Sequence, residues 1–388
     1  LLFTGDFVET GTEQNSEWEW EQWFEVSMKP LLSRMALAPT DGNHDDTPNL
    51  NYTYHFNTDK TFNKTATVKP QFDGITYSFV YGDALFMVYS HQDFWRGSYS
   101  YANGTSTYLS NDVANWFKDQ VEKYPDTKWR IAAVHKNLFT GSGHQTDEDG
   151  ALFRATLLPV FQELNIDFVI QGHDHIYEVM GPINNTTKTI VPGSVTNVEL
   201  VSPDSNKNPK GQQGGTFNVK DGTLYFVNGT CGRKRYYPYT QDEMEAGFDK
   251  HKVEGYWDLF TGKYGQPGAP AFSEISVSSS EIEVKTYTSD ANAQATLFDT
   301  FKIVKNGNTG IEENKQSAKL YPTYAKDKIN TTESDIIRVN AIDLTGKIYP
   351  LPFDNQHIDV SNLTDGIYVV QIFTNEKTRS ERIVKTSR

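Results

Sequence analysis

The chain has 388 residues, more than one compact core usually holds, so two domains are expected. Its formal net charge of −14 argues against nucleic acid as the main partner, because binding to a phosphate backbone needs a basic surface. No apolar run is long enough to cross a bilayer, so we expect no membrane span. The single cysteine, Cys231, excludes an internal disulfide and a thiolate metal cluster, and we expect it to be packed in the interior.

The first part of the chain alternates strand and helix. Apolar strands are expected at residues 1–4, 35–38, 76–80, 85–90, 129–134 and 166–171. Helices are expected after Ser16 and after Ser110, which can act as N-caps, and at residues 151–165. This order is typical of a layered α/β fold.

From Thr223 the pattern changes to β, with strands expected at residues 223–228, 275–277, 282–286 and 300–304. Residues 306–317 are polar and read as a linker between a first domain, 1–305, and a second, 318–388. The second domain holds short alternating strands, which predict a small all-β, immunoglobulin-like sandwich. It has ten Lys and Arg against nine Asp and Glu, so the acidity of the chain lies before it.

Four short polar motifs each follow an apolar strand: Gly5-Asp6, Gly42-Asn43-His44-Asp45, Val134-His135 and Gly172-His173-Asp174-His175. In an open α/β sheet the carboxyl ends of the strands form the ligand crevice. We therefore expect five side chains that are distant in sequence to converge: Asp6, Asn43, His135, His173 and His175.

These residue types fit a pair of metal ions. A carboxylate can bridge two cations, and imidazole and amide oxygen are good ligands for zinc, iron and manganese. Two metals about 3.5–4 Å apart can clamp the oxygens of an in-line displacement at phosphorus. Each motif alone also reads as a turn, a helix cap or a structural histidine, as we expect for His91, His251 and His357, but their joint occurrence at strand ends favours the metal site.

The four motifs, in this order, resemble those of the calcineurin-like metallophosphoesterase superfamily over about residues 1–305. The resemblance implies a four-layer α/β/β/α sandwich that binds two ions of iron, zinc or manganese. It implies that Asp6 bridges the two ions, that Asn43, His135 and His173 complete one position, and that His175 belongs to the other.

The resemblance also implies catalytic roles. His44 would contact the substrate phosphate and protonate the leaving group. Within the superfamily the chain looks most like purple acid phosphatases, where a histidine near the position of His144 touches the phosphate; an exposed loop histidine is the alternative for His144. Purple acid phosphatases have a tyrosine three residues after the bridging aspartate, where this chain has Glu9. We expect Glu9 to hydrogen-bond His44 and raise its basicity.

The first motif of the superfamily, Asp-x-His, is not found before Leu1. The resemblance therefore predicts an N-terminally truncated domain with two metal ligands missing from one position. In this form the chain is expected to bind one metal weakly and to hydrolyse its substrate slowly or not at all.

The last 70 residues resemble the sorting tail of the bacterial type IX secretion system, in Leu320-Tyr321-Pro322, in the run from Asp343 to Lys347, in Gly366-Ile367-Tyr368-Val369-Val370 and in Arg382-Ile383-Val384-Lys385. This implies a secreted or cell-surface protein of a Bacteroidetes-type bacterium, with the type IX machinery as partner. An adhesion sandwich is the alternative.

The sequence thus predicts a secreted metallophosphoesterase that hydrolyses small phosphate monoesters, with diesters left open. The competing hypothesis is a non-catalytic cell-surface binding protein on a phosphoesterase scaffold. The incomplete metal site favours the second hypothesis, whereas His44 and the intact motif at residues 172–175 favour the first.

Overall fold

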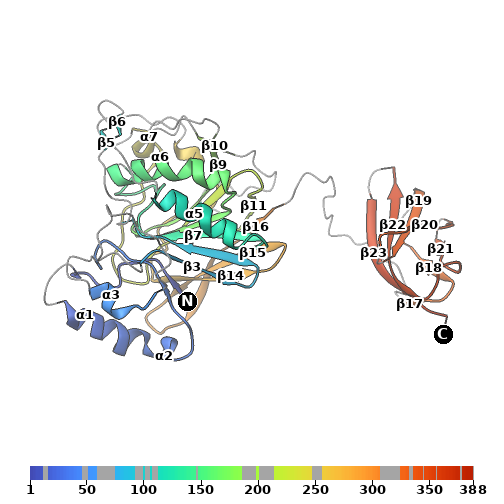
Figure 1. The fold of residues 1–388 in the computed structure, drawn as a ribbon, viewed down its shortest axis with the longest axis horizontal. Coiled ribbons are helices and arrows are strands. Elements are labelled where there is room, and N and C mark those ends of the chain that lie inside the picture. The colour runs from blue at the N-terminus through green and yellow to red at the C-terminus, as the bar shows by residue number, and fades with distance from the viewer. Residues whose placement is uncertain are drawn as a thin grey trace. The chain divides into compact units, whose positions relative to one another are not determined.

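The computed structural model forms two compact units, Leu1–Gly307 and Asn308–Arg388 (Figure 1). It describes residues 1–11, 16–45, 51–58, 75–91, 99–100, 105–106, 112–145, 147–185, 198–200, 214–246, 256–305, 324–331, 335–343, 345–354, 356–375 and 378–387. The expected linker at 306–317, the expected cap Ser110 and His251 lie outside these residues.

The centre of the first unit is an eight-stranded mixed sheet in the order β10-β9-β12-β8-β7-β4-β3, with β13 paired to β9. Its strands are β3 (Tyr77–Tyr81), β4 (Ala84–Val88), β7 (Trp129–Val134), β8 (Phe168–Gln171), β9 (Tyr177–Asn185), β10 (Val198–Leu200), β12 (Thr223–Asn228) and β13 (Tyr264–Gly265). The four strands β4, β7, β8 and β12 are neighbours and parallel, so their carboxyl ends lie at one edge.

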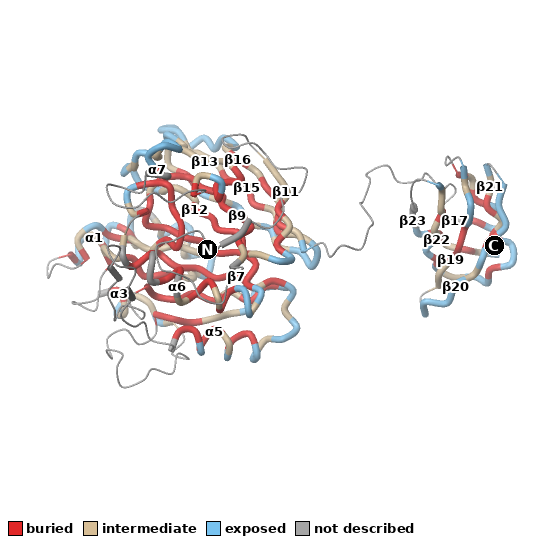
Figure 2. Tube along the Cα trace, turned by 90° about the horizontal axis from the view of Figure 1, so that it is seen from above, coloured by how far each residue is buried: buried red, intermediate tan, exposed pale blue. Residues whose placement is uncertain are grey.

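Both faces of this sheet are covered, which is why β7 and β8 read as continuous apolar runs. Helices α5 (Asp112–Lys123) and α6 (Glu148–Glu163) lie together on one side of the sheet (Figure 2). They contribute to one core, in which Val113, Phe117 and Phe161 are buried. The other face packs on a four-stranded sheet, β11-β16-β15-β14, through a second core that contains Trp129, Phe168, Ile282 and Phe301.

That second sheet consists of β11 (Thr216–Asn218), β14 (Ala271–Val277), β15 (Glu281–Ser289) and β16 (Ala295–Val304). Strand β15 turns alternate residues, such as Ile282 and Val284, into the core between the sheets, whereas Glu283 and Lys285 stay part exposed. The predicted α/β class is confirmed. The described part of the chain shows the layers helix, sheet and sheet in the expected order.

The first two motifs follow a parallel pair outside the large sheet, β1 (Leu2–Phe3) and β2 (Ala38–Pro39). Between these strands lie α1 (Glu17–Glu21), a π-helical stretch (Gln22–Met28) and α2 (Lys29–Leu32), whose apolar side chains form a separate aromatic core around Phe7, Trp20 and Trp23. Ser16 stands at the N-cap position as expected, but its side chain makes no capping hydrogen bond.

The remaining described elements of this unit are short: α3 (Asn51–His55), β5 (Tyr99–Ser100), β6 (Thr105–Ser106), α7 (Gln241–Ala246) and a 3-10 helix at Tyr256–Leu259. The hairpin expected at Gly82-Asp83 is present, with β3 and β4 antiparallel around it. Strand β9 was not expected, because Gly181-Pro182 in its middle reads as a turn. Cys231 is exposed, contrary to the expectation that it is packed.

The second unit is all β, as predicted. It contains a five-stranded sheet, β17-β23-β22-β19-β20, and a pair, β18-β21. The strands are β17 (Tyr324–Ala325), β18 (Lys328–Asn330), β19 (Ile336–Asp343), β20 (Ile348–Pro350), β21 (His357–Asp359), β22 (Gly366–Thr374) and β23 (Thr378–Lys385). Its own core includes Val339, Val370 and Ile383, so the unit buries apolar surface independently of the first.

Candidate metal centre

Glycines allow the loops that follow β1, β2 and β8 to approach one another closely. Gly5 has a φ of +91°, and a Cβ on it would lie 2.6 Å from Nδ1 of His135. A Cβ on Gly42 would lie 2.2 Å from the main-chain nitrogen of Asp6, and one on Gly172 would lie 2.6 Å from the carbonyl oxygen of Thr4. Any side chain at these positions would therefore force the loops apart.

Asp45 fastens the loops after β1 and β2 to each other. Its Oδ1 accepts hydrogen bonds from the main-chain N–H of Phe7 at 2.6 Å and of Val8 at 3.2 Å, and its Oδ2 accepts one from Gly42 at 2.8 Å. The side chain is fully buried. Buried amides need partners, so this carboxylate fixes the relative position of Asp6 and Asn43.

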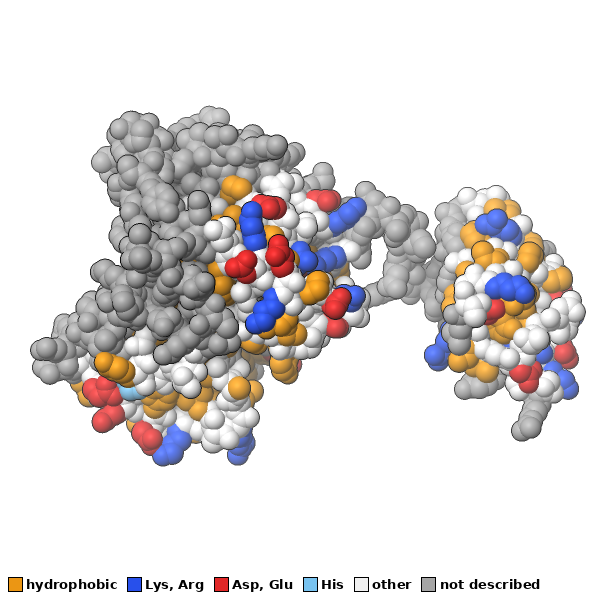
Figure 3. Space-filling model, viewed as in Figure 1, with side chains coloured by type: hydrophobic (Ala, Val, Ile, Leu, Met, Phe, Trp, Pro, Cys, Tyr) orange, Lys and Arg blue, Asp and Glu red, His pale blue; other side chains and the backbone are white. Residues whose placement is uncertain are grey.

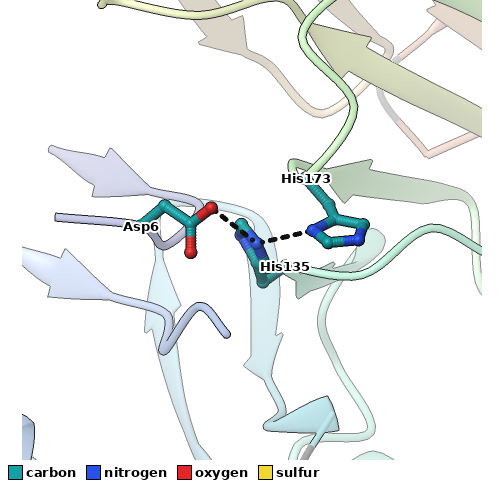
Figure 4. A group of neighbouring side chains, drawn as sticks. All are labelled: Asp6, His135 and His173. Carbon is teal, nitrogen blue, oxygen red and sulfur yellow. Dashed lines mark hydrogen bonds and ion pairs between the residues drawn. The ribbon is translucent and has the colours of Figure 1, made fainter. Parts of the chain in front are cut away.

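His135, which follows β7, is the centre of the converging group. Its Nε2 lies 3.2 Å from Oδ2 of Asp6, 3.1 Å from Oδ1 of Asn43 and 3.2 Å from Nδ1 of His173. Figure 4 shows Asp6 on one side of the imidazole and His173 on the other. The second ring nitrogen, Nδ1, lies 2.7 Å from the carbonyl oxygen of Thr4, to which it can donate.

The atoms that meet at Nε2 of His135 do not carry enough protons for every contact to be a hydrogen bond. When Nδ1 of His135 donates to Thr4, Nε2 presents a lone pair to the oxygens of Asp6 and Asn43, which also present lone pairs. One ring proton could serve only one of these contacts. A cation among the four atoms would satisfy all of them, so the donor set fits a metal ion.

His173 agrees with this assignment. Its backbone φ of +63° is unusual for a residue other than glycine and turns Nδ1 toward His135. Its Nε2 is buried without a hydrogen-bond partner among the described residues. Burial, and then the neighbouring His135, lower the pKa of His173 well below its ordinary value, which keeps the imidazole neutral as a metal ligand must be.

The ionisation of Asp6 and His135 is coupled. Burial opposes charge on Asp6, but His135 holds the pKa of this carboxyl below its usual range. Burial would lower the pKa of His135, yet the Asp6 carboxylate outweighs it and raises the pKa. The carboxylate is therefore present as an anion, which is the form that binds a cation.

His175 stands apart from this group. Asp6, His135 and His173 offer ligand atoms within 4.8 Å of one another, and His175 is in no such group among the described residues. Its ring instead stacks on Tyr236, with centroids 4.5 Å apart and planes 8° from parallel. Burial, and then Lys234, lower the pKa of His175 to about 4, so its imidazole is neutral.

His44 contacts the Asp6 carboxylate through its backbone. Its main-chain N–H donates to Oδ1 of Asp6 at 3.0 Å, and its ring Nδ1 lies 2.7 Å from the carbonyl oxygen of Glu9. The expected bond to the Glu9 side chain is corrected by the structure, because the Glu9 carboxylate lies at the surface, 3.8 Å from Nζ of Lys234. A main-chain carbonyl orients His44 without adding a full negative charge.

His144 lies next to the group formed by Asp6, His135 and His173. Its ring centroid is 3.8 Å from that of His173, and its Nδ1 is 2.8 Å from Oδ2 of Asp147, the residue that precedes α6. Burial lowers the pKa of His144, but Asp147, and next Asp174, outweigh this and raise it. Among the described residues, His144, Asp147 and His173 also form a possible ligand group.

His91 is buried at the carboxyl end of β4, with its ring centroid 5.9 Å from that of His135. His357, in the second unit, contacts Asp354 in an exposed turn.

Sequence reasoning assigned no role to Asp45, Tyr236 or Lys234. The run Arg233-Lys234-Arg235-Tyr236 just after β12, at the same edge of the sheet, is the signal that could have located the last two.

Comparison with known proteins agrees with this arrangement. Residues 1–177 match the family described as calcineurin-like phosphoesterase. This segment is a calcineurin-like phosphoesterase domain. It contains every metal ligand and catalytic residue predicted from the sequence, from Asp6 to His175.

Two of the curated relatives that match parts of the chain show its extent. An uncharacterized protein of Mycobacterium tuberculosis is 24% identical over 204 residues, which are 49% of this chain and 37% of that protein. Purple acid phosphatase 5 of Arabidopsis thaliana is 26% identical over 176 residues, 45% of this chain and 34% of that protein. The matches thus span about a third of the length of these relatives. A solved purple acid phosphatase from yellow lupin covers 79% of this chain and 46% of its own, with 13% identity and a TM-score of 0.47.

Residues 319–386 match the secretion system C-terminal sorting domain. This sorting domain indicates export by type IX secretion to the cell surface or beyond. Among the described helices, none has the length and apolar character needed to cross a bilayer.

Proposed function

We propose that the protein is a secreted phosphatase that hydrolyses phosphate monoesters at a dinuclear metal centre. The observation that supports this most directly is the meeting of Asp6, Asn43, His135 and His173, where Nε2 of His135 lies 3.1–3.2 Å from three atoms that offer lone pairs. Oxygen and imidazole ligands suit zinc, iron or manganese. Phosphate diesters are the second substrate class to test.

In this proposal the four residues would hold one ion, and Asp6 and His175 would contribute to a second. Such ions act as Lewis acids toward phosphoryl oxygens and lower the pKa of water. The protein supplies their fixed positions, since Asp45 and the close-packed glycines determine where Asp6 and Asn43 lie.

The histidines next to the ions handle protons. His44 is oriented by the Glu9 carbonyl at Nδ1, which leaves Nε2 for a proton that it gives to the departing alcohol. His144, whose raised pKa favours the imidazolium, donates from Nε2 to a phosphoryl oxygen and offsets the charge that develops there. Asp147 orients the His144 ring through Nδ1.

Two measurements on the full chain test the proposal. Metal content is determined after purification and again after chelation, and release of p-nitrophenol from its phosphate ester is followed in the same samples. We expect one tightly held ion per chain and a second that is held weakly, with a slow turnover that chelation removes and added metal restores. Bound metal without turnover, or a chain that holds no metal, would contradict the proposed phosphatase and favour the alternative, a binding protein on a phosphoesterase scaffold.

A further inference from the structure

The loop from Gly229 to Tyr239 lies at the rim of the metal centre. It follows β12, which pairs in parallel with β8, so it leaves the sheet at the edge where His173 and His175 follow β8. Within this loop the ring of Tyr236 covers His175 and comes within 5.6 Å of the ring of His144. The loop is therefore in direct contact with residues of the proposed active site.

Several hydrogen bonds fix this loop. The Ser142 hydroxyl donates to the carbonyl of Tyr237 at 2.8 Å, and the N–H of Tyr239 donates to the carbonyl of Gly141 at 2.9 Å. Inside the loop, Nη1 of Arg235 donates to the carbonyl of Gly232 at 2.7 Å. Arg235 thus braces the backbone of the loop that carries Arg233 and Lys234.

Those two cations, Arg233 and Lys234, face solvent in a unit that is acidic as a whole. On the face drawn in Figure 3, basic and acidic side chains of the first unit are interspersed. In the sequence, by contrast, residues 233–235 are three consecutive cations. Among the described residues, Arg233 has no hydrogen-bond or ion-pair partner. Nζ of Lys234 lies 3.8 Å from Oε1 of Glu9, an exposed contact that a stronger anion can replace at little cost.

The Glu9 contact also shows which part of a substrate this loop would meet. The carbonyl of Glu9 holds His44, the group that we assign to the departing alcohol, while its carboxylate reaches Lys234. Lys234 therefore lies on the leaving-group side of the centre. We propose that Arg233 and Lys234 form an anion subsite that selects phosphate monoesters whose alcohol carries a second anionic group, a carboxylate or another phosphate. This inference rests on the proposed function, because it places the substrate phosphate at the metal centre.

Binding of two stable phosphonates tests the subsite without turnover. Propylphosphonate and 3-phosphonopropionate have the same number of carbons, and only the second carries a carboxylate. Isothermal titration of the metal-loaded full chain should show about tenfold tighter binding of 3-phosphonopropionate, as expected for one or two partly exposed charge pairs. In the double variant Arg233→Gln with Lys234→Met the preference should fall to about twofold or less, while propylphosphonate binds within about twofold of the wild type.

Lys220→Met controls for the loss of an exposed positive charge away from the site, since Lys220 lies at the opposite end of β12. It should keep the preference, and Lys234→Arg should keep most of it. The inference is overturned if the double variant retains the wild-type preference, or if Lys220→Met loses as much. Hydrolysis of p-nitrophenyl phosphate, measured in parallel, separates the two ideas: turnover with an unaltered preference rejects only the subsite, whereas no turnover in any metal-loaded form rejects the proposed function.

Discussion

On one side of the site Asp6, His135 and His173 form a buried group, and main-chain contacts from Thr4 and Asp45 fix the loops that carry it. On the other side, His175 packs under an exposed loop with Tyr236 and Lys234. The buried side has little freedom to rearrange. Its ligand atoms are therefore in place before a cation binds, which favours tight metal binding. The side chains on the exposed side can exchange their contacts within the protein for contacts with a substrate. Discrimination between phosphate esters of different alcohols requires this.

The strongest test of the buried side is His135→Ala. This change removes the atom at which all the close contacts of the group meet, so we expect bound metal to fall at least about 100-fold in affinity and hydrolysis to fall with it. Metal analysis after dialysis gives the first quantity, and p-nitrophenol release gives the second. His357→Ala, in an exposed turn of the second unit, should change neither. Full metal content in His135→Ala would mean that the buried group is not the binding site.

Asp45→Ala tests whether the buried side depends on its main-chain contacts. The loss of the carboxylate leaves three amides without partners in a buried place, which we expect to lower the free energy of unfolding of the first unit by about 3 kcal/mol. All the tryptophans precede residue 308, so denaturant unfolding followed by tryptophan fluorescence reports on this unit alone.

Asp290→Ala is the matched control for Asp45. This aspartate also accepts two main-chain hydrogen bonds, from Asn292 and Gln294, but it does so in an exposed turn. Water can replace it there, so the loss should stay below about 1 kcal/mol. Equal losses in the two variants would show that burial of the Asp45 contacts is not what matters.

Sequence reasoning was most successful where the chain's own pattern decides the structure. Strands at Trp129–Val134 and Thr223–Asn228 have the predicted bounds, because buried apolar runs with turn residues at their ends leave few alternatives. The convergence of Asp6, Asn43 and His135 also follows from motif position, since each residue stands just after a strand.

The rest of the site depends on contacts between distant segments, which no local pattern contains. Nothing near Glu9 indicates that its carbonyl rather than its carboxylate meets His44, or that Lys234, more than 200 residues later, lies beside it. Tyr236 reaches His175 for the same reason, through the parallel pairing of β12 with β8. Register and side-chain direction at long range are tertiary properties.

A smaller effect is expected at the boundary between the two sides, where Asp147 supports His144. Burial lowers the pKa of His144, and the Asp147 carboxylate raises it by more; the imidazolium is therefore present up to a higher pH than in a free histidine. If this imidazolium is needed, hydrolysis declines as pH rises through its pKa. Asp147→Asn should move that alkaline decline toward lower pH, with the maximal rate changed by less than about tenfold. If the alkaline limb of the pH profile of kcat stays in place in Asp147→Asn, protonation of His144 does not control hydrolysis.

The smallest effect is expected for Glu9→Gln on the exposed side. The carbonyl that holds His44 is unchanged by this substitution, so hydrolysis of p-nitrophenyl phosphate should stay within about twofold of the wild type. Because the carboxylate no longer competes for Lys234, binding of 3-phosphonopropionate should become slightly tighter, by about twofold at most. Glu281→Gln, which breaks an exposed ion pair with Lys302 on the second sheet, controls for the loss of one negative charge. A tenfold loss of hydrolysis in Glu9→Gln, but not in Glu281→Gln, would show that the Glu9 carboxylate, not only its carbonyl, supports His44. Hydrolysis would then depend on fixed side-chain contacts on the exposed side as well as on the buried side.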